Sequence, residues 1–375
     1  MARKKRKIAV RNKKHTAFRI AEALVILLAI AGAVFGAVKF FSRKPFTTRS
    51  ISLTPSDLMT GTGDGVLYAK GNLLEFRSFK DEDENYSISL SGTPTGIVGT
   101  GGVTAVYSED GVQILGADFG ITHEGKIVTV RGGSTHIAVL SRRADGSEKL
   151  TVYSGAGQEV YSLEFAAQRL MSFGFSEVSP NTLWTMELDS ASGSPRTTVT
   201  TFDLSRMSST GVIIVSGELI EDIFFTEQSV YLIGTESLIR YSASQNREIY
   251  RVRLHGYRVI DRSRRESSPM LLLVPRSCAS LKEAGSVRLL TVAQKDVAEE
   301  LSVTVTLPED TVGCHLENGW LVVIRPASAL RYSFRGVQDG VLDMSSSQTV
   351  SSFKLDDRHI LLERSGEYVL LIPVK

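Results

Sequence analysis

The sequence has few of the residues that build catalytic or metal centres. It contains only two cysteines, Cys278 and Cys314, and they are far apart along the chain. None of its six histidines stands in an HExxH motif or another close metal-ligand spacing, and no G-x-S-x-G nucleophile motif occurs. We therefore predict no catalytic residues, no cofactor and no metal site. We predict that the two cysteines are unpaired thiols; a disulfide is the alternative, because that bond persists outside the cytoplasm.

The greater part of the chain also lacks the basic surface of a nucleic-acid-binding protein. The overall formal charge is +2, but residues 1–41 hold ten Lys/Arg and one Glu, a charge of +9. The remaining 334 residues therefore carry −7. A mildly acidic surface repels phosphate backbones, so this composition excludes a general nucleic-acid binder.

One long apolar run stands near the N-terminus. Residues 1–19 contain nine basic residues and no acidic one, and they are followed by IAEALVILLAIAGAVFGAVKFF at 20–41. About 20 such residues cross a bilayer core as a helix. The basic excess before the run places the N-terminus in the cytoplasm and the rest of the chain outside it. The residues expected within this span include Leu24, Ile26, Leu27, Leu28, Gly32 and Gly36.

Two further interpretations of this run stay open. Ala31-Gly32-Ala33 offers a signal-peptidase site, but five more apolar or small residues follow it, which favours an uncleaved signal anchor. Gly32 and Gly36 form a GxxxG pattern that would let two helices approach closely. A homodimer through this helix is therefore one prediction, and an ordinary single helix with small residues is the other.

After residue 45 the pattern is that of strands and turns. The segments 164–173 and 293–301 are the only ones with some helical character. Short runs rich in Val, Ile, Leu, Thr and Tyr alternate with Gly, Ser, Asp and Asn, as in β-hairpins. Eight hairpins recur, and their first strands begin near Val66, Val103, Ile137, Leu183, Val230, Met270, Trp320 and Ile360.

The spacing of these hairpins predicts an all-β propeller. The steps run from 34 to 50 residues with a mean of 42, and a four-stranded blade typically repeats every ~40–45 residues. Eight blades fit best, while seven blades or two packed β-sandwiches are the alternatives. EVYSLEF, EIYRVRL, LSVTVTL and the first-blade segment YSISL have the sequence of outer strands.

The tetrapeptide SISL occurs at 50–53 and again at 87–90, and this repetition predicts how the ring closes. Each copy ends 13 residues before the next hairpin begins. The last hairpin ends at Val374, so its blade lacks an outer strand. We predict that RSISL at 49–53 supplies that strand, because closure protects sheet edges that would otherwise pair with other chains. The propeller is then 49–375, and a short linker, 42–48, joins it to the span.

At this point the chain resembles a known class. Its spacing and strand pattern look like WD40-like or PQQ-like β-propellers. The basic tail, signal anchor and propeller together are similar to membrane-anchored envelope proteins of Gram-positive bacteria, especially Clostridia. The resemblance is architectural, because the WD dipeptide and a regular blade-end Trp are absent. Quinone-dependent dehydrogenases share the fold, but their vicinal cysteine pair is missing here, so we do not expect an enzyme.

Two polar or glycine-rich features receive structural interpretations. The clusters GTGDG at 61–65 and GIVGTGG at 96–102 lead into strands, so turns and tight packing explain them better than a phosphate cradle. DEDEN at 81–85 lacks the glycine and distal glutamate of a calcium loop, so a solvated acidic loop is the prediction.

An arginine-rich stretch at 250–266 is the candidate binding patch. Arginine forks pair with carboxylate or phosphate, and tyrosine adds a flat amphipathic contact. The alternative is that alternating arginines form the solvent face of an outer strand. The candidate residues are Arg251, Arg253, Tyr257, Arg258, Arg262, Arg264 and Arg265.

The sequence therefore favours a single-pass membrane protein that displays a propeller outside the cell. The predicted function is a non-catalytic platform for a protein partner in the cell envelope, because propeller faces collect loops from every blade. The alternative is a sensor or lectin-like module that binds a wall glycan or another anionic polymer.

Overall fold

A computed structural model describes the chain from residue 45 to residue 374, except for 55, 57, 100–101, 118–119, 167–169, 190–192, 246, 264–268, 293–300 and 318. The predicted membrane span at 20–41 lies outside the described residues.

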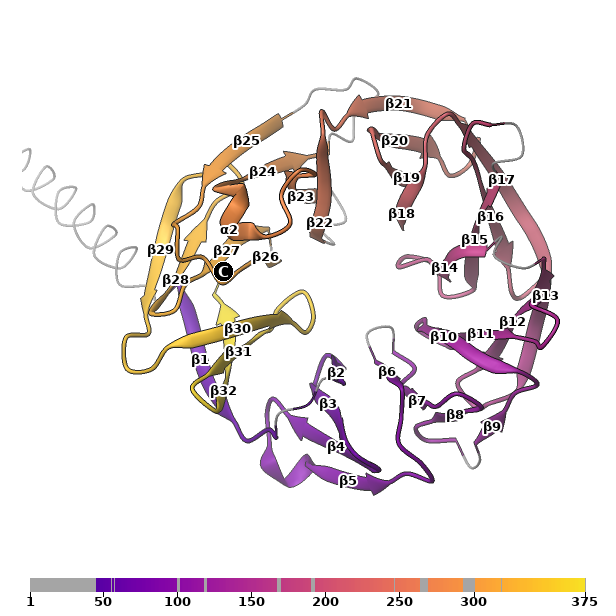
Figure 1. The fold of residues 1–375 in the computed structure, drawn as a ribbon, viewed down its shortest axis with the longest axis horizontal. Coiled ribbons are helices and arrows are strands. Elements are labelled where there is room, and N and C mark those ends of the chain that lie inside the picture. Colours follow the sequence, from indigo (N-terminus) through magenta and orange to yellow (C-terminus); the bar gives the residue numbers. More distant parts are fainter. Residues whose placement is uncertain are drawn as a thin grey trace, which may run out of the picture. The chain divides into compact units, whose positions relative to one another are not determined.

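Eight four-stranded antiparallel sheets follow one another around a ring, as the hairpin spacing predicted (Figure 1). The chain is an eight-bladed β-propeller. From the innermost strand outward, blades 1 to 4 are β2 (Met59–Gly61), β3 (Gly65–Lys70), β4 (Leu73–Ser78), β5 (Tyr86–Ser89); β6 (Gly96–Val98), β7 (Ala105–Tyr107), β8 (Gly111–Ile114), β9 (Ile121–Thr122); β10 (Lys126–Gly132), β11 (His136–Arg142), β12 (Glu148–Ser154), β13 (Glu159–Phe165); and β14 (Leu170–Phe175), β15 (Thr182–Asp189), β16 (Arg196–Asp203), β17 (Ser208–Ser216).

Blades 5 to 8 repeat the same order. They are β18 (Ile220–Phe225), β19 (Ser229–Gly234), β20 (Ser237–Ser242), β21 (Glu248–Arg253); β22 (Tyr257–Ser263), β23 (Met270–Pro275), β24 (Ser286–Thr291), β25 (Leu301–Thr306); β26 (Gly313–Glu317), β27 (Trp320–Ile324), β28 (Ser328–Tyr332), β29 (Gln338–Asp343); and β30 (Thr349–Lys354), β31 (Ile360–Arg364), β32 (Glu367–Pro373), with β1 (Phe46–Ile51) outermost. Two short helices, η1 (Glu82–Glu84) and α2 (Leu281–Ala284), lie in turns.

The ring closes as the sequence predicted. Strand β1 pairs with β32 in antiparallel register, with Phe46 opposite Pro373 and Ile51 opposite Tyr368. The strand begins three residues before the predicted boundary at 49, because Phe46 is an apolar anchor that is buried between blades 7 and 8. Both ends of the described chain therefore meet in one blade, where β1 covers the edge that β32 would otherwise expose.

The packing explains the two kinds of strand pattern in the sequence. The second strand of each blade is buried on both faces, as in β27 (WLVVI), and therefore reads as a continuous apolar run. The outermost strands alternate instead, as in β17, where Ile213 and Val215 are buried but Val212 and Ile214 are exposed. Apolar clusters fill the spaces between neighbouring blades, and each of them contains residues of two blades.

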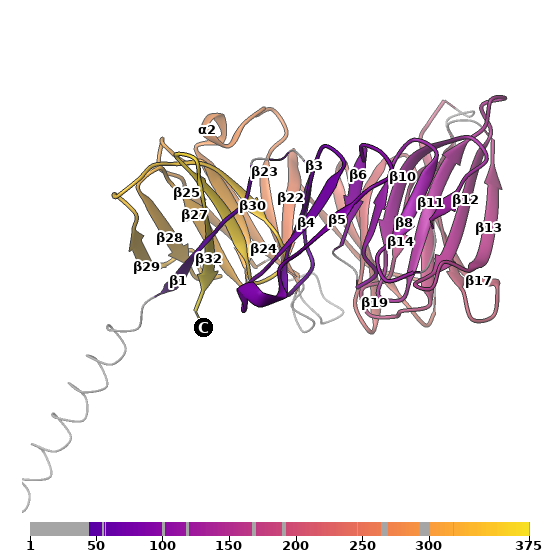
Figure 2. The ribbon, with the colours of Figure 1, turned by 90° about the horizontal axis from the view of Figure 1, so that it is seen from below.

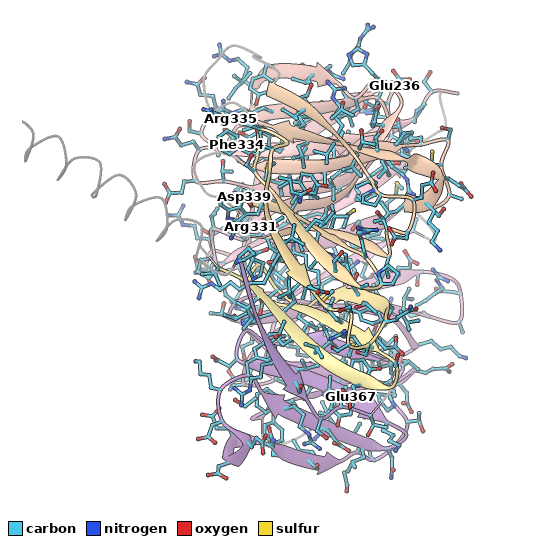
Figure 3. All side chains as sticks on the ribbon, turned by 90° about the vertical axis from the view of Figure 1, so that its left-hand side faces the viewer. Glu236, Arg331, Phe334, Arg335, Asp339 and Glu367 are labelled. Atoms are coloured by element: carbon cyan, nitrogen blue, oxygen red, sulfur yellow. The ribbon has the colours of Figure 1, made fainter. Side chains whose placement is uncertain are left out.

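The propeller has two faces that the chain defines. We call the linker face the one with the loops between consecutive blades, and the terminal face the one where β1 begins and β32 ends. In Figure 2, α2 lies at the linker face and the end of β32 at the terminal face. Figure 3 shows Glu236, from a linker-face turn, on the side opposite Phe334 and Arg335, from a terminal-face turn.

The structure tests several predictions that the sequence made for short segments. The segment 164–173 is not helical where it is described: it belongs to β13 and β14, because its apolar residues pack between blades 3 and 4. The segment 293–301 is described only at its last residue, the start of β25.

The acidic loop at 81–85 contains η1, and its Asn85 and Glu84 accept hydrogen bonds from Ser78. The predicted tight packing of the glycine cluster is confirmed at Gly61, where a Cβ would lie 2.4 Å from the Leu355 carbonyl oxygen.

The described chain has neither a membrane-spanning helix nor a metal-binding cluster. Neither of its helices is long and apolar enough to span a bilayer. No group of three or more His, Cys, Asp or Glu side chains in the described ranges is arranged to hold a metal ion.

Candidate functional site at the centre of the ring

Five of the eight innermost strands carry a β-bulge. The register against the second strand shifts at one extra residue in β10, β14, β18, β22 and β30. A bulge leaves that residue without a partner in the ladder and redirects its side chain. We call the five residues the bulge residues; they are Val128, Met171, Glu221, Ile260 and Val350.

The bulge residues lie at a common level of the ring. Innermost strands of a propeller all run in one direction, here from the linker face to the terminal face. In β10, β14, β18 and β30 the bulge residue is four positions before the last residue of the strand, and in β22 it is three positions before it. Four of them therefore lie in the half of the strand nearer the linker face, and Ile260 lies at the middle of β22.

Four of the five bulge residues are large, apolar and exposed. Their exposed fractions run from 36% for Ile260 to 65% for Val350. Scattered exposed apolar residues are ordinary, but four on the inner strands of one ring at one level form a set. The fifth, Glu221, is held by both terminal nitrogens of Arg276, at 2.9 and 2.5 Å.

Toward the terminal face the lining of the ring becomes charged. The Arg262 guanidinium on β22 binds Glu177 Oε1 at 2.7 Å and Asp222 Oδ2 at 3.4 Å. It also donates to the Ile223 carbonyl at 3.0 Å and lies 5.3 Å from the centroid of the Phe224 ring. One arginine thus joins blades 4, 5 and 6, so its charge is already balanced by the protein.

A second ion pair joins blades 6, 7 and 8. Lys354 Nζ on β30 donates to Asp261 Oδ1 and to the Leu316 carbonyl, both at 2.8 Å. The other Asp261 oxygen accepts from the Leu316 backbone N–H at 2.7 Å. These bonds link three innermost strands that no ladder connects.

Beside this pair lie two titratable groups that are neutral at pH 7. Glu317 is 0% exposed, and neither of its carboxyl oxygens has a hydrogen-bond partner among the described residues. Burial raises the pKa of Glu317 to about 9, against the opposing influence of Lys354. Burial also lowers the pKa of His315 to about 4, and its Nε2 lies 2.9 Å from Ser352 Oγ. Because Glu317 does not reach solvent, its carboxyl group is not accessible as an acid or base.

The structure separates the arginine-rich stretch into two groups. Arg251 and Arg253 are on β21, the outermost strand of blade 5, which was the alternative interpretation. Tyr257, Arg258 and Arg262 are on β22, the innermost strand of blade 6, so the width of a blade separates them from the first group. These five residues do not form one continuous patch, because the chain crosses from the rim to the centre between 253 and 257, and their binding role stays a prediction.

The charges of this stretch are also partly neutralised. Arg251 pairs with Glu218 at 3.1 Å and with Glu248 at 3.0 Å. Arg264 and Arg265 lie outside the described residues, so their binding role stays a prediction. Cys278 and Cys314 are both free thiols.

A hollow of the described surface lies beside blade 2. It measures about 650 Å³, and its lining includes Tyr107, Asp110, Gln113 and Thr122. Blade 2 has the shortest strands, of two to four residues, so it fills less of its sector than the other blades.

Comparison with known proteins supports the fold. No family model matches the sequence, and no curated protein matches it. Three solved structures cover 88% of this chain each: BamB from Moraxella catarrhalis (TM-score 0.55, 10% identity, 98% of its own chain), Sqt1 of Saccharomyces cerevisiae (0.56, 10%, 99%) and the WD40 domain of SCAP from fission yeast (0.58, 11%, 94%). The chain thus has the fold of WD40-like and BamB-like β-propellers, and identities this low carry nothing beyond the fold.

Sequence reasoning missed the bulge residues. Three of them stand next to another apolar residue, in Ile127-Val128, Leu170-Met171 and Val259-Ile260, where a regular strand would alternate. Such pairs are a signal of a bulge, but they also occur in strands that are buried on both faces. Only the ladder register distinguishes the two cases.

Proposed function

We propose that this chain is a non-catalytic interaction platform, anchored in a membrane by residues 20–41, that binds a protein partner in the cell envelope. The partner contacts the centre of the ring at the linker face. The single observation that carries this proposal is the set of four exposed apolar bulge residues, Val128, Met171, Ile260 and Val350. Burying such side chains favours association by about 1.5–3 kcal/mol each.

A protein partner is better supported than an anionic polymer. A polymer would need a continuous basic surface, and the arginine-rich stretch is divided between the rim and the centre of the ring. Two of its arginines, Arg251 and Arg262, already bind carboxylates of the propeller. Apolar side chains of different blades, in contrast, suit an apolar segment of a partner protein.

In-cell photocrosslinking with the full-length protein tests the proposal. A photoreactive amino acid is placed at Met171 or Val350, and at Ile214 as a matched control. Ile214 is also exposed, at 47%, but it lies on the outermost strand of blade 4. We expect one reproducible protein adduct at the first two positions and none at the third. Equal adducts at all three positions would contradict a binding site at the centre.

A substitution gives a second measurement. Changing Met171→Asp or Val350→Asp should weaken binding of that partner by about tenfold or more, since 1.4 kcal/mol corresponds to a factor of ten. Because both side chains are solvent-exposed, the fold should survive, and its melting temperature is the control. Unchanged affinity in both variants would refute the proposed contact.

A further inference from the structure

We infer that one turn of blade 7, residues 333–337, rests on the surface of the bilayer that holds the protein. This inference rests on the proposed membrane anchor at 20–41. The partner surface is lipid: apolar side chains of the turn enter the interface, and Arg335 pairs with lipid phosphate.

The length of chain between the anchor and the propeller limits how far this face can be from lipid. The predicted span ends at Phe41 and β1 begins at Phe46, five residues later. A fully extended chain covers about 3.3–3.6 Å per residue, so this tether reaches no more than about 18 Å. The beginning of β1 therefore lies within that distance of the end of the span.

The blade 7 turn is next to this point of the propeller. Phe46 pairs with Pro373, and the following residue, Val374, accepts a hydrogen bond from Arg331 at the end of β28. Arg331 is itself held by Asp339 and by the face of the Trp320 ring. The turn begins two residues after Arg331, on the terminal face where the chain enters the propeller.

Hydrogen bonds hold the turn in one shape. The Ser333 N–H donates to the Val337 carbonyl, and the Gly336 N–H donates to the Ser333 carbonyl, both at 2.9 Å. Gly336 has φ +73° and packs so closely on Val303 of β25 that a Cβ would lie 2.5 Å from it. The turn therefore has its own hydrogen bonds and packs against blade 6, so it is a defined surface feature.

The tip of the turn has the chemistry of an interfacial contact. Phe334 is 47% exposed and Val337 is 62% exposed. The Arg335 guanidinium lies 5.4 Å from the Phe334 ring centroid, and it forms no ion pair within the described chain. Figure 3 shows Phe334 and Arg335 together at this face, opposite Glu236. Aromatic and apolar residues beside a cation are the combination that holds proteins at the headgroup layer.

An acidic turn of blade 1 on the same face favours contact on the side of blade 7. Blade 1, the other neighbour of blade 8, carries the acidic residues of 81–85 in its own terminal-face turn. Anionic headgroups repel these carboxylates. The propeller therefore leans toward blade 7, with the acidic turn away from lipid.

Quenching by brominated lipids tests the contact. Full-length protein carrying Phe334→Trp is reconstituted into vesicles of phosphatidylcholine and phosphatidylglycerol with bromine on the acyl chains, and the signal of the unsubstituted protein is subtracted. We expect about a twofold loss of emission from the new indole, because an interfacial side chain sits at the headgroup–acyl boundary. Adding Arg335→Glu should remove most of this loss.

Met207→Trp is the matched control. Met207 is 61% exposed in a terminal-face turn as well, but that turn belongs to blade 4, across the ring from blade 8 (Figure 1). Equal quenching at 334 and 207 would overturn the inference, because it would mean unspecific adsorption. No quenching at 334 in protein that floats with the vesicles would also overturn it, and would leave the anchor intact. Protein that fails to float would instead refute the anchor itself.

Discussion

Replacing Glu317 by glutamine should stabilise the propeller at neutral pH. The carboxyl group is fully buried, neither oxygen has a partner among the described residues, and Lys354 is already bound to Asp261. Burial raises the pKa of Glu317 from 4.5 to about 9. The folded protein therefore holds a proton on Glu317 at pH 7 that the unfolded chain releases.

The sign and size of the effect follow from this difference in bound protons. Between pH 4.5 and about 9 the folded state binds one proton more than the unfolded state, so the free energy of unfolding falls as pH rises. Each pH unit costs about 1.4 kcal/mol, and pH 7 is 2.5 units above 4.5, so the total is about 3 kcal/mol. Glutamine has the same shape and no proton to hold. Its amide would be unpartnered too, so the net gain should be smaller, about 1–3 kcal/mol.

Chemical denaturation of the full-length protein in detergent, followed by tryptophan fluorescence, measures this change in the free energy of unfolding. Unfolding is compared at pH 5, 7 and 8.5 for the wild type, Glu317→Gln and Glu317→Met, which removes the unpartnered polar atoms altogether. Glu124→Gln is the matched control, because Glu124 is exposed and its change should stay within about 0.5 kcal/mol.

The pH dependence distinguishes the effect of the proton on Glu317 from a general packing effect. We expect the advantage of Glu317→Gln over wild type to be small at pH 5 and to grow toward pH 8.5. An advantage that is the same at all three values would refute the reasoning, because it would show that Glu317 is not protonated in the folded state. A loss of stability at pH 8.5 would show that the carboxylate is ionised and paired.

Three further predictions concern closure, the ion pair and the thiols. Phe46→Ala should cost about 3–5 kcal/mol, because it removes a buried ring from the closing strand, and limited proteolysis should then cut near the N-terminal end of the propeller. Lys354→Met should cost about 3–5 kcal/mol in a denaturation experiment, because it leaves the Asp261 carboxylate without its cation. Asp261→Asn should cost less, because Lys354 keeps Asp357 at 3.8 Å, and the double variant should cost less than the sum of the two. Burial raises the pKa of the Cys314 thiol to about 12, whereas Cys278 is partly exposed, so mass spectrometry after alkylation should find label on Cys278 alone until the protein unfolds.

The repeated hairpin pattern of the sequence was sufficient to predict the ring of blades. Local alternation of strands and turns produced the hairpins, and their spacing near 42 residues corresponds to one blade each. The closing strand could be predicted because the last hairpin ended without an outer strand and SISL stood before the first one. These features are local or periodic, so they can be read without knowing which strands lie opposite one another.

The arginine-rich stretch shows that closeness in sequence does not predict which residues are close in space. Its residues are adjacent in sequence, yet the loop between β21 and β22 carries the chain from the rim of blade 5 to the centre of blade 6. The carboxylates that bind Arg262 come from Glu177 and Asp222, which lie 85 and 40 residues away. Arginines that are close along the chain therefore do not form one continuous surface patch.

The sequence by itself determined the all-β hairpin pattern and the way in which the two ends of the propeller meet, because periodicity and β-pattern are properties of neighbouring residues. It favoured eight blades, and the structure decided between eight and seven. Only the tertiary structure decided which residues share the centre of the ring. A bulge depends on the register between two strands, and the burial of Glu317 depends on the packing of blades 6, 7 and 8 around it. Both properties arise from contacts between segments that are distant in sequence, where the pattern of one segment carries no information about the other.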